Sequence, residues 1–276
     1  MEVFLILVEL TKEELKSFFD ETSLKVIRFF LKKSILSQPE KLKTQSDLPI
    51  QIPKEHIEQW VVQSLGVTPV GAGSYPIDVK SNDWGADVKM LSCEIDDKGY
   101  LKNRDSGETS LAQKFGDDNF GDGNSLDELF KNREYDFIWL KWKEILINKY
   151  RQVESEHNIK DIYYFLILRA GTKFHLCGLK LDLSKLSDTE ININRSTNNS
   201  IWIKNFIKDE LGHVKIYKAK KRLELRLKPK KWVENNLVIT FDTSFNQINA
   251  NIREKIESET LEEYIDRVLI PIIKSN

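Results

Sequence analysis

Cysteine and histidine are scarce in this chain, with two and four residues respectively among 276. Cys93 and Cys177 both lie in apolar, strand-like segments, which predicts buried thiols in a reducing compartment and excludes a disulfide framework. The histidines are scattered without the spacing of metal ligands. Neither residue type therefore indicates a metal site.

Nucleotide-driven and membrane-spanning proteins are excluded as well. Gly71-Ala-Gly73 is followed by no Lys-Ser/Thr pair, so a Walker phosphate loop is missing. No apolar run approaches the roughly 20 residues that span a bilayer, and the first ten residues carry Glu2 and Glu9 without a basic leader. The composition, 31% charged and 40% apolar, is typical of an ordinary globular protein. We expect a cytoplasmic protein without a membrane partner.

The periodicity along the chain predicts a single domain of the α/β (α+β) class over residues 1–276. We expect a helical N-terminal part (1–52), a core with an α-β-β order (53–181), and basic strands with a C-terminal helix (182–276). Hydrophobic spacing, caps and turn residues predict helices beginning at Thr11 and over 23–36, 54–65 and 127–151. They predict strands over 74–81, 86–95, 162–168, 173–181 and 213–227. Residues 97–125, rich in Gly, Asp and Asn, predict a flexible loop.

The most informative segment is 75–89, which predicts a β-hairpin with two carboxylates and a lysine on one face. Its two extended runs flank Asn82-Asp83-Trp84-Gly85, whose residue types suit a tight turn. If Lys80 pairs with Asp87, then Asp78 lies opposite Lys89 and diagonal to Asp87, about 7–8 Å away. Because side chains alternate along a strand, Asp87 and Lys89 share a face.

One divalent ion could bridge two carboxylates placed in this way. Oxygen ligands suit Mg²⁺, which keeps several waters and takes only one or two protein carboxylates. Such an ion polarises a phosphate and lowers the pKa of an attacking water, and Lys89 would orient that water or offset charge on phosphorus. The hairpin therefore predicts a metal-dependent phosphodiester-cleaving centre.

An acid followed two places later by lysine is not specific by itself, because it occurs four times. The four pairs are Glu14/Lys16, Asp78/Lys80, Asp87/Lys89 and Asp96/Lys98. The hairpin combines this triplet with a proline two residues before an aspartate and with an apolar continuation of the strand. Two alternatives stay open: an exposed hairpin with cross-strand ion pairs, and Asp78-Val79-Lys80 as the triplet. Residues 96–99 have turn chemistry.

At these residues the chain resembles the PD-(D/E)xK nuclease superfamily and, in size and layout, a type II restriction endonuclease. The resemblance covers roughly residues 50–95. Pro76-Ile77-Asp78 supplies the first acid with an inserted isoleucine, and Asp87-Val88-Lys89 supplies the triplet after a separation of eight residues, short for the family. The resemblance implies a mixed central sheet flanked by helices, Mg²⁺ on Asp78 and Asp87, and Lys89 beside the water.

The superfamily often carries an additional glutamate on an upstream helix. Glu58, within 54–65, is the candidate for this role. It borders the expected buried stripe of that helix, beside Val62. A surface glutamate without any function is the alternative for this residue.

A basic segment is the second functional feature. Nine basic residues lie between Val214 and Trp232 against the single acid Glu224, although the whole chain has a net charge of −1. They are Lys215, Lys218, Lys220, Lys221, Arg222, Arg226, Lys228, Lys230 and Lys231. Leucines alternate with Glu224 and Arg226, which predicts a half-buried strand with a charged outer face. Such a stripe is typical of a phosphate-backbone partner, and a lysine-guarded sheet edge is the alternative.

These features together predict double-stranded DNA as the partner, with Mg²⁺ as the cofactor and a homodimer as one option for the assembly. Arg195 and Asn198, in a polar loop, are candidates for reading bases, and the loop over 97–125 could contact DNA. The expected function is that of a type II restriction endonuclease. The alternatives are a DNA-repair or mobile-element nuclease, a nuclease toxin, and a non-catalytic DNA-binding module.

Overall fold

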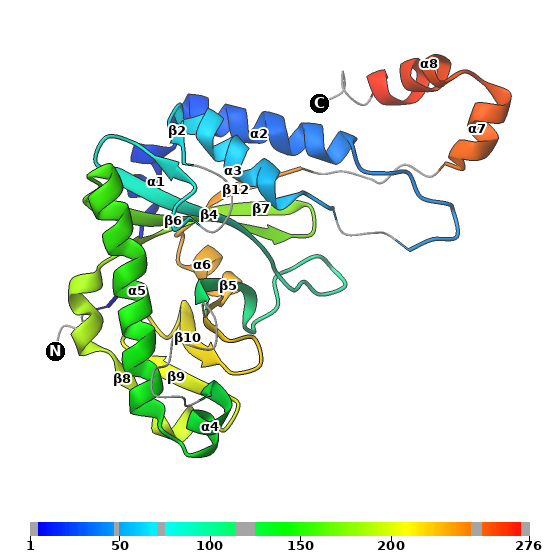
Figure 1. The fold of residues 1–276 in the computed structure, drawn as a ribbon. Helices are drawn as coiled ribbons and strands as arrows, with labels where there is room; N and C mark the ends of the chain where they lie inside the picture. Colours follow the sequence, from blue (N-terminus) through cyan, green and yellow to red (C-terminus); the bar gives the residue numbers. More distant parts are fainter. Residues whose placement is uncertain (1–4, 47–49, 71–74, 114–124, 244–249, 272–276) are drawn as a thin grey trace.

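The computed structural model describes residues 5–46, 50–70, 75–113, 125–243 and 250–271. These residues form a mixed α/β fold of two sheets flanked by helices (Figure 1). The helices are α1 (Lys12–Phe18), α2 (Glu21–Leu36), α3 (Lys54–Leu65), α4 (Leu126–Lys131), α5 (Tyr135–His157), α6 (Pro229–Glu234), α7 (Ile252–Ser258) and α8 (Leu261–Tyr264). Short helical turns are η2 (Leu183–Asp188), η3 (Ile193–Arg195) and η4 (Ile265–Leu269).

The described strands divide between the two sheets. The first, mixed sheet has the order β1-β7-β6-β4-β3-β2, with β12 also paired to β7, and its β4 and β6 are parallel. Its strands are β1 (Leu7–Glu9), β2 (Thr68–Pro69), β3 (Val79–Lys80), β4 (Trp84–Ser92), β6 (Asp161–Ala170), β7 (Lys173–Leu181) and β12 (Ile239–Asp242). The second sheet is antiparallel, in the order β5-β11-β10-β9-β8. Its strands are β5 (Ser106–Gln113), β8 (Glu190–Ile191), β9 (Ser200–Lys204), β10 (Gly212–Tyr217) and β11 (Arg222–Leu227).

Two hydrophobic cores cover the two faces of the mixed sheet. On one face, α1, α2 and α3 pack against alternate residues of β4, including Ala86 and Val88. On the other face, α5 and the second sheet form a larger core around Trp142 and Tyr164. Helix α5 runs along both sheets (Figure 1). The opposite face of β4, which carries Asp87 and Lys89, is therefore directed toward the space between the two sheets.

Several elements confirm the sequence predictions. Helix α1 begins after Thr11, whose side chain and Glu14 form a capping box. Helix α3 spans Lys54–Leu65 as expected, and β6 and β7 contain the predicted strands 162–168 and 173–181. Helix α2 begins two residues earlier than expected, because Asp20 rather than a later residue caps it.

Three predictions for later segments are wrong. The helix expected over 127–151 is divided into α4 and α5, with Arg133 at a φ of 59° in the break. The loop expected over 97–125 contains β5, which pairs with the distant β11; its residues 114–124 lie outside the described part. The strand extension toward Trp232 is the helix α6, which begins at Pro229.

The cysteine prediction is confirmed in part. Both thiols are free, Cys177 is buried, and Cys93 is only half-buried. Burial raises the pKa of the Cys93 thiol to about 12, so it is not a reactive thiolate at neutral pH.

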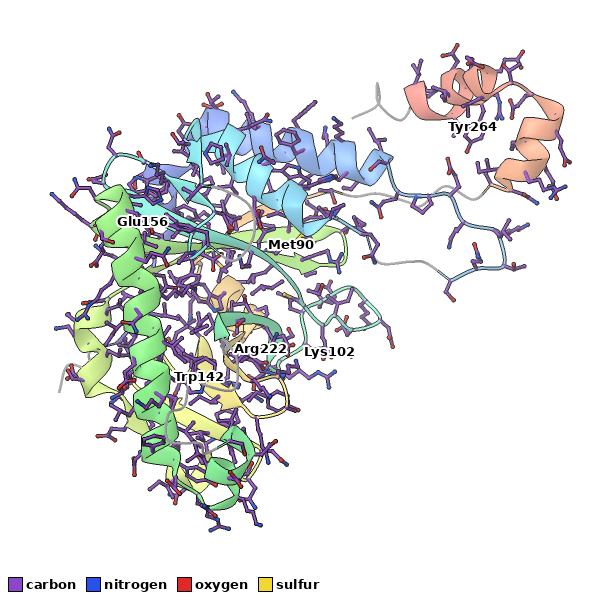
Figure 2. All side chains as sticks on the ribbon, in the orientation of Figure 1. Met90, Lys102, Trp142, Glu156, Arg222 and Tyr264 are labelled. Atoms are coloured by element: carbon purple, nitrogen blue, oxygen red, sulfur yellow. The ribbon has the colours of Figure 1, made fainter. Side chains whose placement is uncertain are left out.

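The C-terminal helices lie on an arm beside the main body. Figure 2 places Tyr264 on this arm, away from the two sheets. The Tyr264 hydroxyl donates a 3.1 Å hydrogen bond to Glu40, in the connection between α2 and α3. None of the described helices is both long and apolar enough to cross a membrane.

Candidate active site

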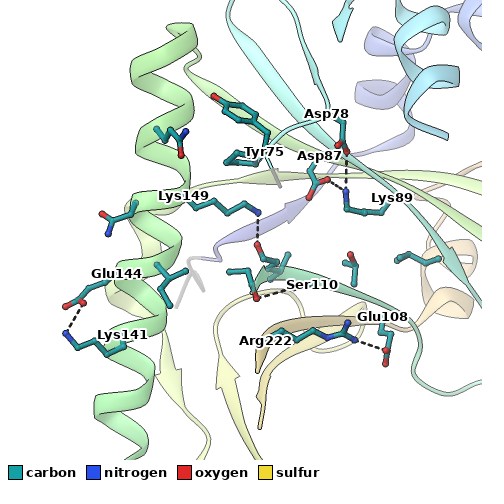
Figure 3. A pocket seen from close by; sticks show the side chains of 18 of the residues that line it. Tyr75, Asp78, Asp87, Lys89, Glu108, Ser110, Lys141, Glu144, Lys149 and Arg222 are labelled. Carbon is teal, nitrogen blue, oxygen red and sulfur yellow. Dashed lines mark hydrogen bonds and ion pairs between the residues drawn. The ribbon is translucent and has the colours of Figure 1, made fainter. Parts of the chain in front are cut away.

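Asp78, Asp87 and Lys89 lie close together on the two strands of the predicted hairpin (Figure 3). The Lys89 ammonium lies 3.2 Å from Asp78 Oδ2 and also pairs with Asp87 Oδ1. It donates a third hydrogen bond, of 3.1 Å, to the main-chain carbonyl of Val88. Three oxygens therefore surround one cation.

The local sequence explains this arrangement. Alternation along β4 directs Ala86 and Val88 toward α3, and Asp87 and Lys89 toward the other face. Asp78 precedes β3 and is held in place by the backbone N–H of Val88, which donates a 2.7 Å hydrogen bond to Asp78 Oδ2. The two acids and the lysine are thus positioned by a single strand and its neighbour.

The expected register of the hairpin is wrong by two residues. Lys80 pairs with Gly85 rather than with Asp87, and the Asp78 N–H donates to the carbonyl of Ala86. The physical reason is a tighter turn, closed by the 2.8 Å hydrogen bond from the Ser81 N–H to the Trp84 carbonyl. This register brings Asp78 beside Asp87 rather than diagonal to it. Residue 74, expected to begin the first strand, lies outside the described residues.

The alternative triplet, Asp78-Val79-Lys80, is not assembled in this site. The Lys80 ammonium lies 3.1 Å from His157 Nδ1, at the end of α5. Val79 is buried in the core on the α3 side of the sheet. Asp78 therefore lies with Lys89, and the acid-x-lysine triplet at this position is the one on β4.

Burial dominates the electrostatics of the site. Asp87 is 5% exposed, and burial raises the pKa of its carboxyl to about 6, although Lys89 acts in the opposite direction. Burial by itself would lower the pKa of Lys89, but Asp87 and Asp78 outweigh it and the net pKa is raised. Lys89 is therefore a stable cation at neutral pH.

The residues of the site fit Mg²⁺. The two carboxylates and the Val88 carbonyl are hard oxygen donors, and they already surround the ammonium of Lys89. Among the described residues, no group of three or more His, Cys, Asp or Glu side chains is placed to hold a metal. Two carboxylates match the number that Mg²⁺ takes from proteins.

The site opens into a cleft of about 960 Å³ between the two sheets and α5. The mixed sheet supplies Asp78, Asp87 and Lys89, and the second sheet supplies residues 108–112 and Arg222. From α5 come the polar residues Lys141, Glu144, Asn148, Lys149 and Gln152. The cleft thus joins the triplet to the strand that carries part of the basic segment.

Lys149, which was not among the predicted site residues, extends from α5 toward Asp87 (Figure 3). Its ammonium donates a 2.7 Å hydrogen bond to the carbonyl of Leu111. Its positive charge also offsets part of the increase that burial causes in the pKa of Asp87. A signal was present in the sequence. Lys149 lies on the same face of α5 as the buried Trp142, Leu146 and Val153, where an apolar residue is expected.

The structure does not bring Glu58 together with the three residues. Glu58 lies half-buried on α3, and α3 packs through Ile57, Trp60 and Val61 on the face of the sheet opposite to Asp87 and Lys89. Residues of α3 are not among those that line the cleft described above.

Much of the basic segment is paired with acids. Glu224 is fully buried and accepts hydrogen bonds from Arg222 and Arg226, at 2.7 Å and 2.5 Å. Both arginines and Lys220 also bind Glu108 on β5. The prediction of a charged outer face is therefore wrong for Glu224, which the surrounding cations cover.

The other predicted DNA contacts lie farther along the second sheet. Lys218 pairs with Asp127 at 3.1 Å, and Lys215 lies over the rings of Trp202 and Tyr217. Lys221 is exposed in the turn between β10 and β11. Arg195 stacks on Trp202 at 3.7 Å, and Asn198 is exposed in the loop that follows. Of these five, none lines the cleft described above.

Comparison of the chain with protein-family models, with curated proteins and with solved structures finds no match. The residues of the site and their geometry are therefore the basis for a proposed function.

Proposed function

We propose that the chain is a Mg²⁺-dependent endonuclease of the restriction type, which hydrolyses phosphodiester bonds in a short, specific site of double-stranded DNA. The observation that carries this proposal is the convergence of Asp78, Asp87 and Lys89 in one cleft. The proposal includes the interpretation of the mixed sheet as the central sheet of a restriction-endonuclease fold. The expected products carry 5′-phosphate ends, as the resemblance implies.

Asp78 and Asp87 would hold Mg²⁺, which supplies Lewis-acid polarisation of the scissile phosphate and a water of lowered pKa. Lys89 keeps its proton, because the two carboxylates raise its pKa against the effect of burial. It therefore acts as a hydrogen-bond donor that orients a water or a phosphate oxygen beside Asp87, rather than as a base. The Val88 N–H orients the carboxylate of Asp78.

The charges of the cleft support a requirement for an added cation. Its lining contains four acids and four bases, so the formal charge is 4 − 4 = 0. These residues are Asp78, Asp87, Glu108, Glu144, Lys89, Lys141, Lys149 and Arg222. A cleft without net positive charge holds a phosphate backbone weakly, and a bound divalent ion gives it the charge that phosphate needs.

The test is incubation of the purified protein with long, unmethylated duplex DNA, in parallel with Mg²⁺ and with EDTA. The proposal predicts discrete fragments with Mg²⁺ only. A smear, or nicking confined to damaged DNA, would favour a repair or mobile-element nuclease or a toxin with the same site. Intact DNA that the protein nevertheless binds would favour a non-catalytic module and contradict the proposal.

A further inference from the structure

A second lysine, Lys149, reaches the candidate site from the side opposite Lys89. Figure 3 shows its side chain extending from α5 with the ammonium beside Asp87, so that the Asp87 carboxylate lies between the two lysines. The two cations come from different layers of the fold, since Lys89 lies on β4 and Lys149 on α5. Both line the same cleft.

The position of Lys149 is unusual for a charged residue. It lies seven residues after Trp142 and four before Val153, both of which are buried against the sheets. Residues at these intervals share one face of a helix. A lysine on such a face is retained at a cost in desolvation, so its charge requires an explanation beyond packing.

The Leu111 carbonyl explains only part of this placement. Leu111 is the extra residue of a β-bulge, since Ser110 and Ala112 pair with the consecutive residues Glu224 and Leu223. Lys149 Nζ donates one hydrogen bond, of 2.7 Å, to its carbonyl. An ammonium has three N–H donors. The ammonium of Lys149 faces the cleft beside Asp87.

We propose that Lys149 is a phosphate-binding cation of this site, which contacts a backbone phosphate of the bound DNA from the α5 side of Asp87. This inference depends on the proposed function for the identity of the ligand. The chemistry is that of an ammonium donor to a phosphate oxygen, which is charge-assisted and stronger than a neutral hydrogen bond. Lys149 would then bind the phosphate from the α5 side, and Lys89 would stay available to orient the attacking water.

Three substitutions separate this role from support of the bulge. Lys149→Arg keeps the charge, whereas Lys149→Gln keeps an N–H donor for the Leu111 carbonyl and removes the charge. Lys149→Met removes both. Lys143→Met is the matched control, because Lys143 lies on the same helix over the ring of Trp139 and outside the lining of the cleft.

The measurement is the affinity of each full-length variant for a fluorescently labelled duplex over a series of salt concentrations, with Ca²⁺ in place of Mg²⁺ to supply the divalent charge. We expect Lys149→Gln and Lys149→Met to weaken binding roughly tenfold, as for one charge-assisted hydrogen bond. The slope of log K against log salt should fall by about one phosphate contact. Lys149→Arg and Lys143→Met should bind like the wild type.

The role of Lys149 is decided by DNA affinity, which is measured independently of cleavage. Wild-type affinity and slope in Lys149→Gln, with a lowered melting temperature in Lys149→Met alone, would show that Lys149 only supports Leu111 and would overturn the inference. A wild type that binds DNA but never cuts it with Mg²⁺ contradicts the proposed function while the binding comparison still decides the role of Lys149. A wild type that binds no DNA overturns both.

Discussion

The backbone N–H of Val88 lies 2.7 Å from Asp78 Oδ2 and donates a hydrogen bond to it. Val88 is the middle residue of the Asp87-Val88-Lys89 triplet, so the strand that carries two of the site residues also orients the third. The same oxygen of Asp78 accepts a hydrogen bond from Lys89. Backbone and side chain of one strand thus fix the distance between the two carboxylates.

This relationship predicts different effects for two substitutions of Asp78. Asp78→Asn keeps an oxygen acceptor for the Val88 N–H, whereas Asp78→Ala leaves that N–H unsatisfied. We expect Asp78→Ala to lower the free energy of unfolding by roughly 1–2 kcal/mol more than Asp78→Asn. Both should lose Mg²⁺-dependent cleavage, because both lose a charged ligand. Urea denaturation and a cleavage assay measure the two effects. Equal stabilities would contradict the orienting role of the hydrogen bond.

The buried Asp87 predicts a specific dependence of stability on pH. Its pKa is raised from 3.8 to about 6 by burial. Between these values the folded protein binds more protons than the unfolded chain, so Asp87 lowers the free energy of unfolding as pH rises through this window. The decrease in the free energy of unfolding is complete above pH 6 and absent below pH 4.

Asp87→Asn should therefore gain stability relative to the wild type as pH rises from 4 to 7. The expected gain is on the order of 1–3 kcal/mol, since one pKa unit corresponds to about 1.4 kcal/mol. Urea denaturation at several pH values, in EDTA, measures the difference between the two proteins. A difference that stays constant from pH 4 to 7 would show that Asp87 titrates as an ordinary carboxyl.

The buried Glu224 predicts a stabilising rather than a DNA-binding role for part of the basic segment. Glu224→Gln leaves Arg222 and Arg226 without a buried negative charge, and we expect a loss of roughly 2–4 kcal/mol in the free energy of unfolding. Glu108→Gln is the matched control. Glu108 binds the same arginines but its side chain is 38% exposed, so the expected loss is about 1 kcal/mol or less. Similar losses in both variants would contradict the importance of burial.

The placement of Asp87 and Lys89 could be predicted from sequence because side-chain alternation is a local property of a strand. The register that brings Asp78 beside Asp87 could not, because it depends on which hydrogen bond closes the turn at Ser81 and Trp84. A shift of two residues in the pairing of the two strands changes neither their composition nor the alternation of their side chains. A hairpin predicted with the wrong pairing nevertheless named the two acids that the structure places beside Lys89.

Pairing between strands far apart in the sequence explains most of the remaining differences between the sequence predictions and the structure. Strand β5 lies in a segment whose Gly, Asp and Ser favour turns, and it becomes a strand by pairing with β11, more than a hundred residues later. Glu108 lies on that strand, so the neutralisation of Arg222 and Arg226 was not visible in the basic segment alone. Lys149 was overlooked for a different reason, since one lysine on an apolar helix face is a weak signal.

The role of Asp78, Asp87 and Lys89 in DNA cleavage is tested by comparing the wild type with Lys89→Ala on the same long duplex DNA with Mg²⁺. Single-turnover cleavage and DNA affinity are measured for both proteins, and the melting temperature is recorded as a control for folding. We expect discrete fragments from the wild type, and a loss of cleavage in Lys89→Ala with nearly unchanged affinity. Cleavage by Lys89→Ala at the wild-type rate would contradict the assignment of this site.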